Sequence, residues 1–382
     1  MDLKLKREQR LLKNMVREFA EKEVGPQLPA LVEKDEKPVH IIKRMGELGL
    51  TGITWPKEYG GCNMGHVARV LALEELARVY PSLAGMLSRT QISPLVILRL
   101  GSEEQKKRFL PPVCRGEVYA TWSVNEGGSG SDVRAMQATA RLDGDSYILN
   151  GRKTFIGNAA WSDYTAVVAK TTEGFSVFVV EKGTQGFMVG RNERMITQET
   201  AKLAPLNEVT FTNCRIPREN LIGREGIGLG PILAGIGDAG RVAASAIALG
   251  IAEACLERAV KHAKEQHRYG KPLSKIESIR FMLGDMASQI EAARWLCYQA
   301  GWLLDQGLSG LQIAKETSIA KLFAVEMAIK VAYKAIEVHG AFGTTIEAGI
   351  VQRLGYVLDT IAAAGSNNTM RLVISNAVAE GR

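Results

Sequence analysis

The residue pattern of this 382-residue chain changes twice along its length, and this change constrains the fold more than any single motif. The first part has apolar residues at helical spacing, as in EQRLLKNMVREFAEKEV. The middle part has short β-branched runs such as SYILNG and YTAVVAK, separated by Gly, Asp and Asn. Long amphipathic stretches then return, as in ASAIALGIAEACLERAVKHAKEQ. We therefore expect an α+β multidomain chain with an N-terminal helical domain (1–115), a middle antiparallel β domain (116–223) and a C-terminal four-helix bundle (224–382).

Composition indicates a soluble globular protein. Hydrophobic residues make up 46% of the chain, which is enough for a large core. No stretch approaches the roughly 18 uncharged apolar residues that a membrane helix requires, so we expect no membrane span. The start, MDLKLKREQR, is charged and has no apolar core behind it, which argues against a secretory leader. We therefore expect a cytoplasmic location.

Charge and cysteine content narrow the possible partners. The 48 basic and 41 acidic residues leave a net charge of +7, which would suit a phosphorylated cofactor or an acidic carrier protein, or would simply maintain solubility. The basic residues are spread along the chain without an aromatic-basic module, so nucleic-acid binding is not expected. The five cysteines are scattered and never form CxxC, which predicts buried free thiols instead of disulfides or a metal site: Cys62, Cys114, Cys214, Cys255 and Cys297.

Five short segments, in order along the chain, carry a family resemblance. They are GITWPKEYGG (52–61), GSEEQKK (101–107), RIPRENLIG (215–223), HRYGKPL (267–273) and VHGAFG (338–343). Each is weak alone, but their order and spacing make the whole chain resemble the acyl-CoA dehydrogenase family. The resemblance implies that fold, FAD as cofactor, and an oxidoreductase that acts on CH–CH bonds of an acyl thioester. Gly226, Gly228 and Gly230 resemble a dinucleotide fingerprint but lack a βαβ unit, so we reject that interpretation.

The segment WSVNEGGSGSD (122–132) runs from a strand into a loop of small residues, whose backbone amides can approach a flavin closely. A Gly/Ser loop alone is more often a plain turn. The resemblance makes it a flavin-contacting segment, with Asn125 where threonine is usual and Gly127 where proline is usual. The contacts that it implies are Trp122, Val124, Asn125, Gly130 and Ser131, of which Ser131 also touches the thioester arm.

The next strand, NGRKTFIGN (150–158), resembles the family strand whose aromatic residue covers one flavin face. Phe155 would be that residue, and Ile156 follows it as a further cofactor contact. Gly157 stands where a Thr or Ser usually bonds flavin N5. The missing hydroxyl leaves two alternatives: altered flavin electronics, or a backbone group in its place.

The family places an arginine and a glutamine from a second subunit on the pyrophosphate and adenosine, and here those positions are Gln266 and Glu277. Arg268 would replace the lost guanidinium if it faces the phosphates, although a surface salt bridge is an equal alternative. Further cofactor contacts implied by the resemblance are Glu337, Gly340, Ser366 and Asn368. A site shared between subunits predicts a homotetramer. His339 is expected to be structural.

Two segments resemble substrate contacts. Asp238 and Arg241 match the Asp-x-x-Arg that orients the pantetheine arm, and the alternative is an ordinary helix ion pair. Arg89 and Thr90 fall where the first domain reaches the acyl end. Arg89 would hold a substrate anion there, or it is a solvated helix charge.

The usual base has no counterpart. Thioester dehydrogenation removes a proton from Cα, conventionally with a carboxylate, while hydride leaves Cβ. The two positions at which the family carries this carboxylate are Ala364 and Gly240 here. The resemblance therefore supports cofactor and thioester binding better than ordinary α,β-dehydrogenation. Either the pocket is enlarged for a bulky or polar acyl group, or substrate, water or another side chain moves the proton.

These observations favour a flavin-dependent acyl-CoA oxidoreductase with a relocated base that passes electrons to an electron-transfer flavoprotein. A related alternative is action on an acyl group tethered to a carrier protein. A catalytically silent member that binds FAD or thioester is the alternative from a different class, because positions 157, 266, 277, 337 and 364 all depart from the family pattern.

Overall fold

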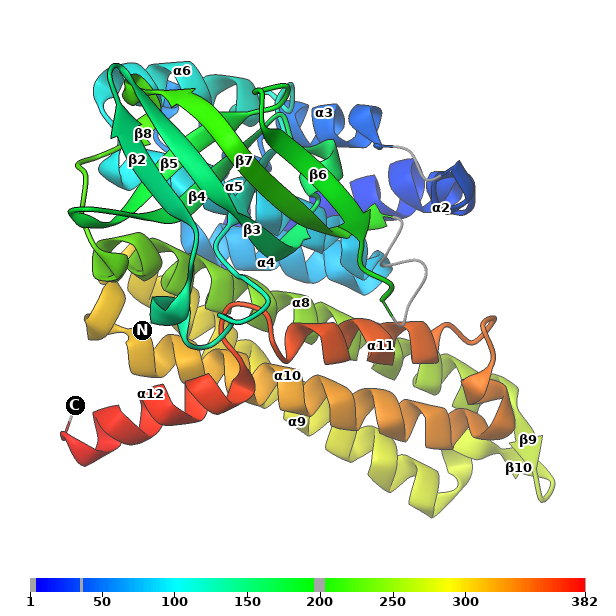
Figure 1. Cartoon of the computed structure of the whole chain (residues 1–382). Helices are drawn as coiled ribbons and strands as arrows, with labels where there is room; N and C mark the ends of the chain where they lie inside the picture. Colours follow the sequence, from blue (N-terminus) through cyan, green and yellow to red (C-terminus); the bar gives the residue numbers. More distant parts are fainter. Residues whose placement is uncertain (1–4, 35–36, 196–202, 382) are drawn as a thin grey trace. The chain divides into compact units, whose positions relative to one another are not determined.

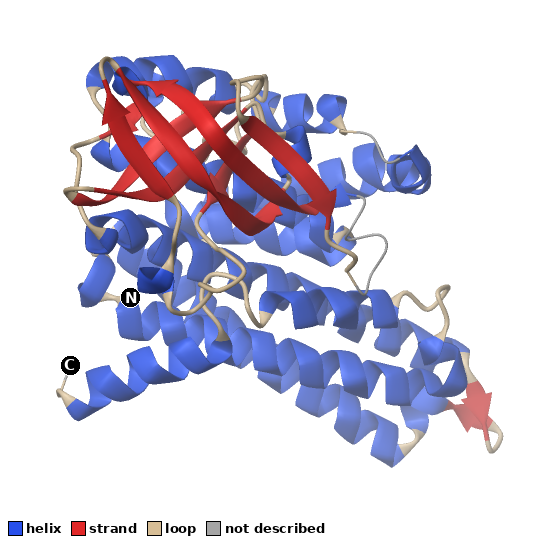
Figure 2. Cartoon of the chain, in the orientation of Figure 1, coloured by secondary structure: helices blue, strands red, loops and turns tan. Residues whose placement is uncertain are grey.

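The computed structural model describes residues 5–34, 37–195 and 203–381, and its elements run from helices to strands and back to helices. Figure 2 shows these helices and strands. The chain divides into two compact units that interleave in sequence. The first and fourth helices belong with the C-terminal helices, whereas the other N-terminal helices belong with the sheet. The boundaries predicted at 115 and 223 remain a prediction. Unit 1 comprises Met1–Leu28, His66–Ala84 and Gly240–Arg382, and unit 2 comprises Pro29–Gly65 and Gly85–Ala239.

Unit 2 contains an eight-stranded sheet within the described residues, seen as the fan of arrows in Figure 1. Its strand order is β6-β7-β3-β2-β4-β5-β8, and β1 pairs with β4. Most pairs are antiparallel, as the sequence predicts, but β4 pairs in parallel with both β1 and β2, so the sheet is mixed. The strands are β1 (Ala120–Ser123), β2 (Thr139–Asp143), β3 (Ser146–Gly157), β4 (Tyr164–Thr171), β5 (Gly174–Glu181), β6 (Phe187–Asn192), β7 (Leu206–Pro217) and β8 (Leu221–Ile222).

Alternation along the central strands builds a core on each face of this sheet. In β4, Ala166 and Val168 pack with α5 and α6, whereas Val167 and Ala169 pack with Phe178 and other residues on the opposite face. This division follows from the two-residue period of a strand. The helices of unit 2 are α2 (Leu28–Lys34), α3 (Val39–Glu47), α5 (Pro81–Leu100, from Gly85 onward), α6 (Glu103–Cys114) and the start of α8 (Leu229–Glu265, up to Ala239).

The GSEEQKK segment has a structural role. Ser102 caps α6 by accepting from the backbone N–H of Gln105 at 3.3 Å, and the Gln105 side chain accepts from the Ser102 N–H at 2.9 Å. The Gln105 amide also donates to the carbonyl oxygens of Glu219 and Leu221, both at 2.7 Å. This motif therefore ties the start of α6 to the end of the sheet.

Unit 1 is helical. α10 lies against α9, α11 and α12, and all four are labelled in Figure 1. The helices that contribute to it are α1 (Arg7–Glu18), α4 (Gly65–Val79), α8 (Leu229–Glu265, from Gly240 onward), α9 (Glu277–Asp305), α10 (Ala314–His339), α11 (Ile350–Thr360) and α12 (Asn367–Ala379), with a small hairpin of β9 (His267–Arg268) and β10 (Lys271–Pro272).

Buried charges join four helices of unit 1. Glu74 and Glu75 on α4 have fully buried side chains. Glu74 binds Lys13 of α1 at 3.1 Å and Arg294 of α9 at 3.3 Å, and it accepts from the Tyr298 hydroxyl at 2.8 Å. Arg294 also pairs with Glu253 of α8. Because removing one partner of such a network leaves a buried charge uncompensated, the network fixes how these helices pack.

By length and composition alone, α8 could cross a membrane. Its runs of uncharged residues are nevertheless short. In the structure, 83% of its most apolar 18-residue window is buried inside the protein. A buried core helix has the same composition, so this helix is weak evidence for a span.

All five cysteines are free, as the sequence predicts. Four are buried as expected, but Cys62 is only partly buried.

Candidate flavin and thioester site

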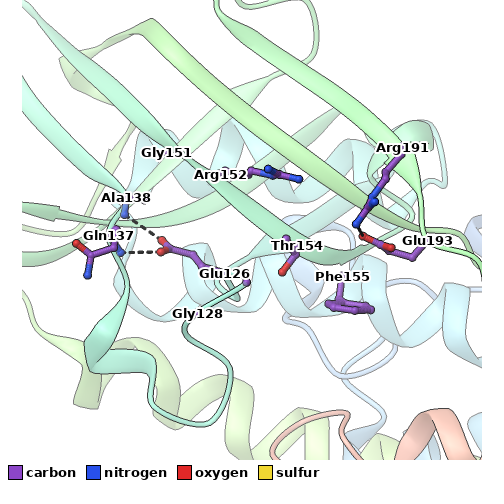
Figure 3. A pocket seen from close by; sticks show the side chains of 11 residues that line it. Glu126, Gly128, Gln137, Ala138, Gly151, Arg152, Thr154, Phe155, Arg191 and Glu193 are labelled. Atoms are coloured by element: carbon purple, nitrogen blue, oxygen red, sulfur yellow. Dashed lines mark hydrogen bonds and ion pairs between the residues drawn. The ribbon is translucent and has the colours of Figure 1, made fainter.

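A buried ion pair holds the small-residue loop that follows β1. The carboxylate of Glu126 accepts from the backbone N–H groups of Gln137 at 2.6 Å and Ala138 at 3.0 Å, drawn as dashed lines in Figure 3. Lys153, on β3, donates to Glu126 at 2.8 Å and to the carbonyl oxygen of Val124 at 3.0 Å. Burial alone would raise the pKa of Glu126, but the Lys153 ammonium and the two N–H donors hold it below its usual value. The loop is therefore fixed at its start.

The backbone of this loop faces open space. A Cβ added at Gly127, Gly128 or Gly130 would have no neighbour within 4 Å. The hydroxyls of Ser129 and Thr154 are buried and have no hydrogen-bond partner among the described residues. A hollow of about 490 Å³ lies here, and Figure 3 shows Phe155 and Thr154 beside it. Open backbone together with unpaired polar atoms is an arrangement that a polar ligand with a flat ring system would satisfy.

The Phe155 side chain is exposed and does not pack in the core. Its backbone is left-handed, with φ of 56°, and 54% of its side chain is exposed. Such a φ is costly for an aromatic residue and is typically found at functional sites. The flanking residue Ile156 is buried in the sheet core, as is Val124 on the preceding segment, so only backbone atoms of these two residues are available to a ligand.

Arg89 of α5 reaches the end of β3. Its NH1 donates to the Asn158 side chain at 2.8 Å and to the Ala204 carbonyl oxygen at 3.2 Å. Its side chain occupies the space where a side chain at Gly157 would lie. The adjacent residue, Thr90, is buried and accepts from the Ala120 N–H at 3.2 Å, so Thr90 supports β1. The Arg89 side chain is half-buried and anchored, which argues against a solvated helix charge.

A single lysine organises the turn that carries Ala364. Lys321 on α10 donates to the carbonyl oxygens of Ile361 at 2.9 Å and Gly365 at 3.0 Å, and to the Asn367 side chain at 2.7 Å. Burial and the nearby Arg241 lower the pKa of Lys321 to about 8. Ala364 itself is left-handed, with φ of 54°. The turn is therefore tightly held, and both a cation, Arg241, and an anion, Glu326, act on Lys321.

Comparison with known proteins identifies this arrangement. Three family models match the chain. They are described as the N-terminal, middle and C-terminal domains of acyl-CoA dehydrogenase, and they cover residues 6–117, 121–214 and 232–379. The chain belongs to the acyl-CoA dehydrogenase family. It is 37% identical to an acyl-CoA dehydrogenase of Bacillus subtilis over 96% of this chain and 97% of that protein. It is 35% identical to the short-chain specific acyl-CoA dehydrogenase of Clostridium acetobutylicum (99% and 100%) and to the acryloyl-CoA reductase (NADH) of Anaerotignum propionicum (90% and 87%).

Solved structures of the family agree along the whole chain. Butyryl-CoA dehydrogenase from Megasphaera elsdenii aligns with a TM-score of 0.93 at 32% identity, over 99% of this chain and 100% of that one. A structure titled as the electron transferring flavoprotein of Acidaminococcus fermentans aligns at 0.94 with 36% identity (99% of both chains). A FAD complex of PigA aligns at 0.93 with 27% identity (99% of both). This acyl-CoA dehydrogenase family member is therefore an FAD-dependent oxidoreductase that acts on acyl-CoA.

The flavin positions of the family all lie in unit 2 and fit a cofactor. Trp122 is half-buried, whereas Asn125, Gly130 and Ser131 are exposed on the small-residue loop. The open loop and the unpaired Ser129 and Thr154 hydroxyls are features that a bound FAD would fill.

The family positions for the ADP half of the cofactor lie in unit 1. Arg268 is exposed in the β9–β10 hairpin, and its guanidinium donates to the carbonyl oxygen of His267; within the described residues it forms no ion pair. Gln266, Glu277 and Glu337 are also exposed, and Gly340 ends α10 with φ of 62°. These side chains are open to a second subunit, as a shared cofactor site would require.

Several expected positions have local structural roles. Ser366 caps α12 by accepting from the Thr369 N–H at 3.1 Å, and Asn368 lies exposed in the first turn of that helix. His339 is buried, binds the Ala335 carbonyl oxygen at 2.7 Å and stacks on His262, so its expected structural role is supported.

The two substrate positions Asp238 and Arg241 lie along α8. Asp238 is buried in unit 2 and pairs with Arg99 at 3.8 Å. Gly240, the second possible base position, is buried within the same helix.

Sequence reasoning missed the two buried lysines, Lys153 and Lys321. The available signal was a charged residue on an otherwise buried face, in NGRKTF and in AKLFAVEMA. Because buried lysines are almost always paired, each pointed to a partner elsewhere in the chain.

Proposed function

We propose that this chain acts on acyl-CoA without a carboxylate base at either family position. The observation that carries the proposal is the Ala364 turn, where a methyl group stands at φ of 54° on a backbone that Lys321 holds firmly. Position 240 is a buried glycine on α8 and offers no proton acceptor either. Another side chain, water or the substrate therefore receives the Cα proton.

Different residues of the chain would bind the flavin and the substrate. The Glu126–Lys153 pair fixes the loop whose residues Asn125, Gly130 and Ser131 would contact the flavin. The exposed ring of Phe155 would cover one flavin face. Asp238 and Arg241 would orient the pantetheine arm. When bound, FAD supplies a hydride acceptor for the substrate Cβ. Lys321, on the Ala364 turn, and the nearby Arg241 would stabilise enolate-like charge on a thioester.

The alternatives of a carrier-tethered substrate and of a silent binding protein are not favoured. The relatives named above are dehydrogenases and a reductase whose names specify CoA thioesters. The unpaired polar atoms of the loop support a cofactor site.

A homotetramer and a flavoprotein electron acceptor complete the proposal. Exposure of Arg268, Glu277 and Glu337 supports a cofactor site shared between subunits. Similarity to the structure titled as an electron transferring flavoprotein supports such a partner. Five free thiols support a cytoplasmic location, since reducing compartments preserve them. Light scattering of the FAD-loaded protein should give four subunits, and a flavin-loaded monomer would contradict the shared site.

Anaerobic flavin bleaching tests the function itself. The purified protein should be yellow, and at least one saturated acyl-CoA from a panel of chain lengths and substituents should bleach it. Rapid turnover of simple acyl-CoAs would show that an unrecognised residue already acts as a strong base. A colourless protein that does not take up FAD would contradict the assignment of the site.

A further inference from the structure

Arg89 and Gly157 are complementary in shape. A Cβ built on Gly157 would lie 2.5 Å from Cδ, 2.6 Å from Nε and 3.2 Å from Cζ of Arg89. Distances below 3.0 Å do not occur for real Cβ atoms, so any larger residue at position 157 would displace the guanidinium. The family hydroxyl at position 157 and the observed position of the Arg89 side chain therefore exclude each other. In this chain the arginine occupies that space.

The Arg89 guanidinium is anchored without being neutralised. Its NH1 uses two neutral acceptors, the Asn158 side chain and the Ala204 carbonyl oxygen. Within residues 5–34, 37–195 and 203–381 no carboxylate pairs with it, whereas Arg108, Arg152 and Arg215 of the same unit each bind one. Asn158 is buried and left-handed, with φ of 59°, so its side chain is a fixed support. Within the described residues, Nε and NH2 of Arg89 donate no hydrogen bond, so both groups are donors for a ligand.

We propose that Arg89, seated against Gly157, recognises a carboxylate on the acyl group, so that the substrate is a thioester of a dicarboxylic acid. This inference rests on the proposed function, because position 157 faces the reacting centre only if the flavin binds as the family resemblance implies. A guanidinium offers parallel donors that match a carboxylate, and charge-assisted bonds of this kind are roughly twice as strong as neutral ones. A neutral acyl group would leave the half-buried cation uncompensated.

The test compares matched thioesters that differ by one carboxylate. The holoprotein is reduced with dithionite, so that saturated thioesters bind without being dehydrogenated. Calorimetry then gives affinities for malonyl-, succinyl- and glutaryl-CoA against acetyl-, propionyl- and butyryl-CoA. We expect at least one dicarboxylic thioester to bind about 10- to 100-fold more tightly than its neutral partner, the range expected for hydrogen bonds to a charged group.

Two variants and a control assign that preference. Arg89→Gln should reduce it to less than about threefold, because a neutral amide cannot replace the charge. Gly157→Ser should reduce it as well, since its Cβ displaces the guanidinium; this variant decides the matter if Arg89→Gln does not fold. Arg108→Gln removes an equal charge from the exposed surface of the same unit and should keep the preference.

The outcomes separate the inference from the proposed function. If neutral thioesters bind and no pair shows a preference, or if the preference survives both variants, the anion site is refuted while the proposed function stands. If no CoA thioester binds to the FAD-loaded protein, the proposed function fails and the inference fails with it.

Discussion

The ammonium of Lys321 donates to the carbonyl oxygen of Gly365 at 3.0 Å, directly beside the residue at the family base position. The same group binds Ile361 and Asn367, so one buried side chain fastens both ends of the turn around Ala364. The position of any residue at 364 is therefore set by a lysine 44 residues before Gly365.

Lys321→Met should destabilise the protein by about 2–4 kcal/mol, because it removes three hydrogen bonds from a charged donor in and around the turn. Denaturant unfolding measures this change. Lys330→Met removes an exposed lysine from the same helix and should stay within about 0.5 kcal/mol of the wild type. Equal effects of the two substitutions would mean that Lys321 does not support the turn.

Ala364→Glu should create or raise dehydrogenation of simple acyl-CoAs, because the carboxylate would be held on the fixed turn. General-base catalysis typically contributes about 10²–10⁴-fold. The backbone at Ala364 is already left-handed, so glutamate adds no new backbone strain. Ala364→Gln has the same size without the charge and should gain nothing. If Ala364→Glu retains FAD and thioester but gains no activity, the pocket is shaped for another reaction; Gly240→Glu tests the second family position in the same assay.

Arg241→Ala should weaken acyl-CoA binding by about 10- to 100-fold and leave FAD retention unchanged, because Arg241 matches the pantetheine segment and not a flavin segment. Calorimetry and the flavin absorbance report the two affinities separately. Arg7→Ala, an exposed change of equal charge in the same unit, is the control. Equal loss of FAD and thioester would identify Arg241 as a structural residue.

Gly250→Ala should destabilise the protein by about 1–3 kcal/mol, the usual cost of overpacking. Its Cβ would lie 2.1 Å from the carbonyl oxygen of Glu74, which forces α8 away from α4. Gly284→Ala on α9 would meet no atom within 4 Å and should stabilise by about 0.5–1 kcal/mol through helix propensity. Thermal or denaturant unfolding that ranks the two variants in the reverse order would contradict this packing.

Stability should fall as pH rises through the weakly acidic range. Burial and the neighbouring Glu74 raise the pKa of Glu253 to about 7, against an ordinary value of 4.5. Between these values the folded protein binds more protons than the unfolded chain, so the contribution is complete below about 4.5 and lost above about 7.

Urea unfolding of the wild type from pH 5 to 8 should therefore show a decrease of about 1–3 kcal/mol attributable to Glu253. Glu253→Gln should flatten that slope, since the amide does not titrate. An unchanged slope in the variant would assign the pH dependence to other groups.

Much of the fold followed from local patterns. Helical spacing and β-branched runs predicted the order of helices, strands and helices, because the periods of 3.6 and 2 are set within each element. The expectation of a wholly antiparallel sheet was wrong at β4, which pairs in parallel with β1 and β2. No short-range sequence pattern relates these segments. Family segments predicted a flavin loop and a substrate helix, and these site assignments stay predictions.

The sequence by itself determined the family, the cofactor class and the absence of carboxylates at positions 364 and 240, since these depend on residue identity in order along the chain. Only the tertiary structure decided which side chains lie next to the expected site residues. The sequence shows Gly157 as a missing hydroxyl and Arg89 as one more helix charge; the fold places the arginine in the space that the glycine leaves. Likewise, Lys321 acquires its role only when α10 meets the turn after α11. The physical reason is that steric exclusion and buried charge pairing depend on distances between segments that are remote along the chain.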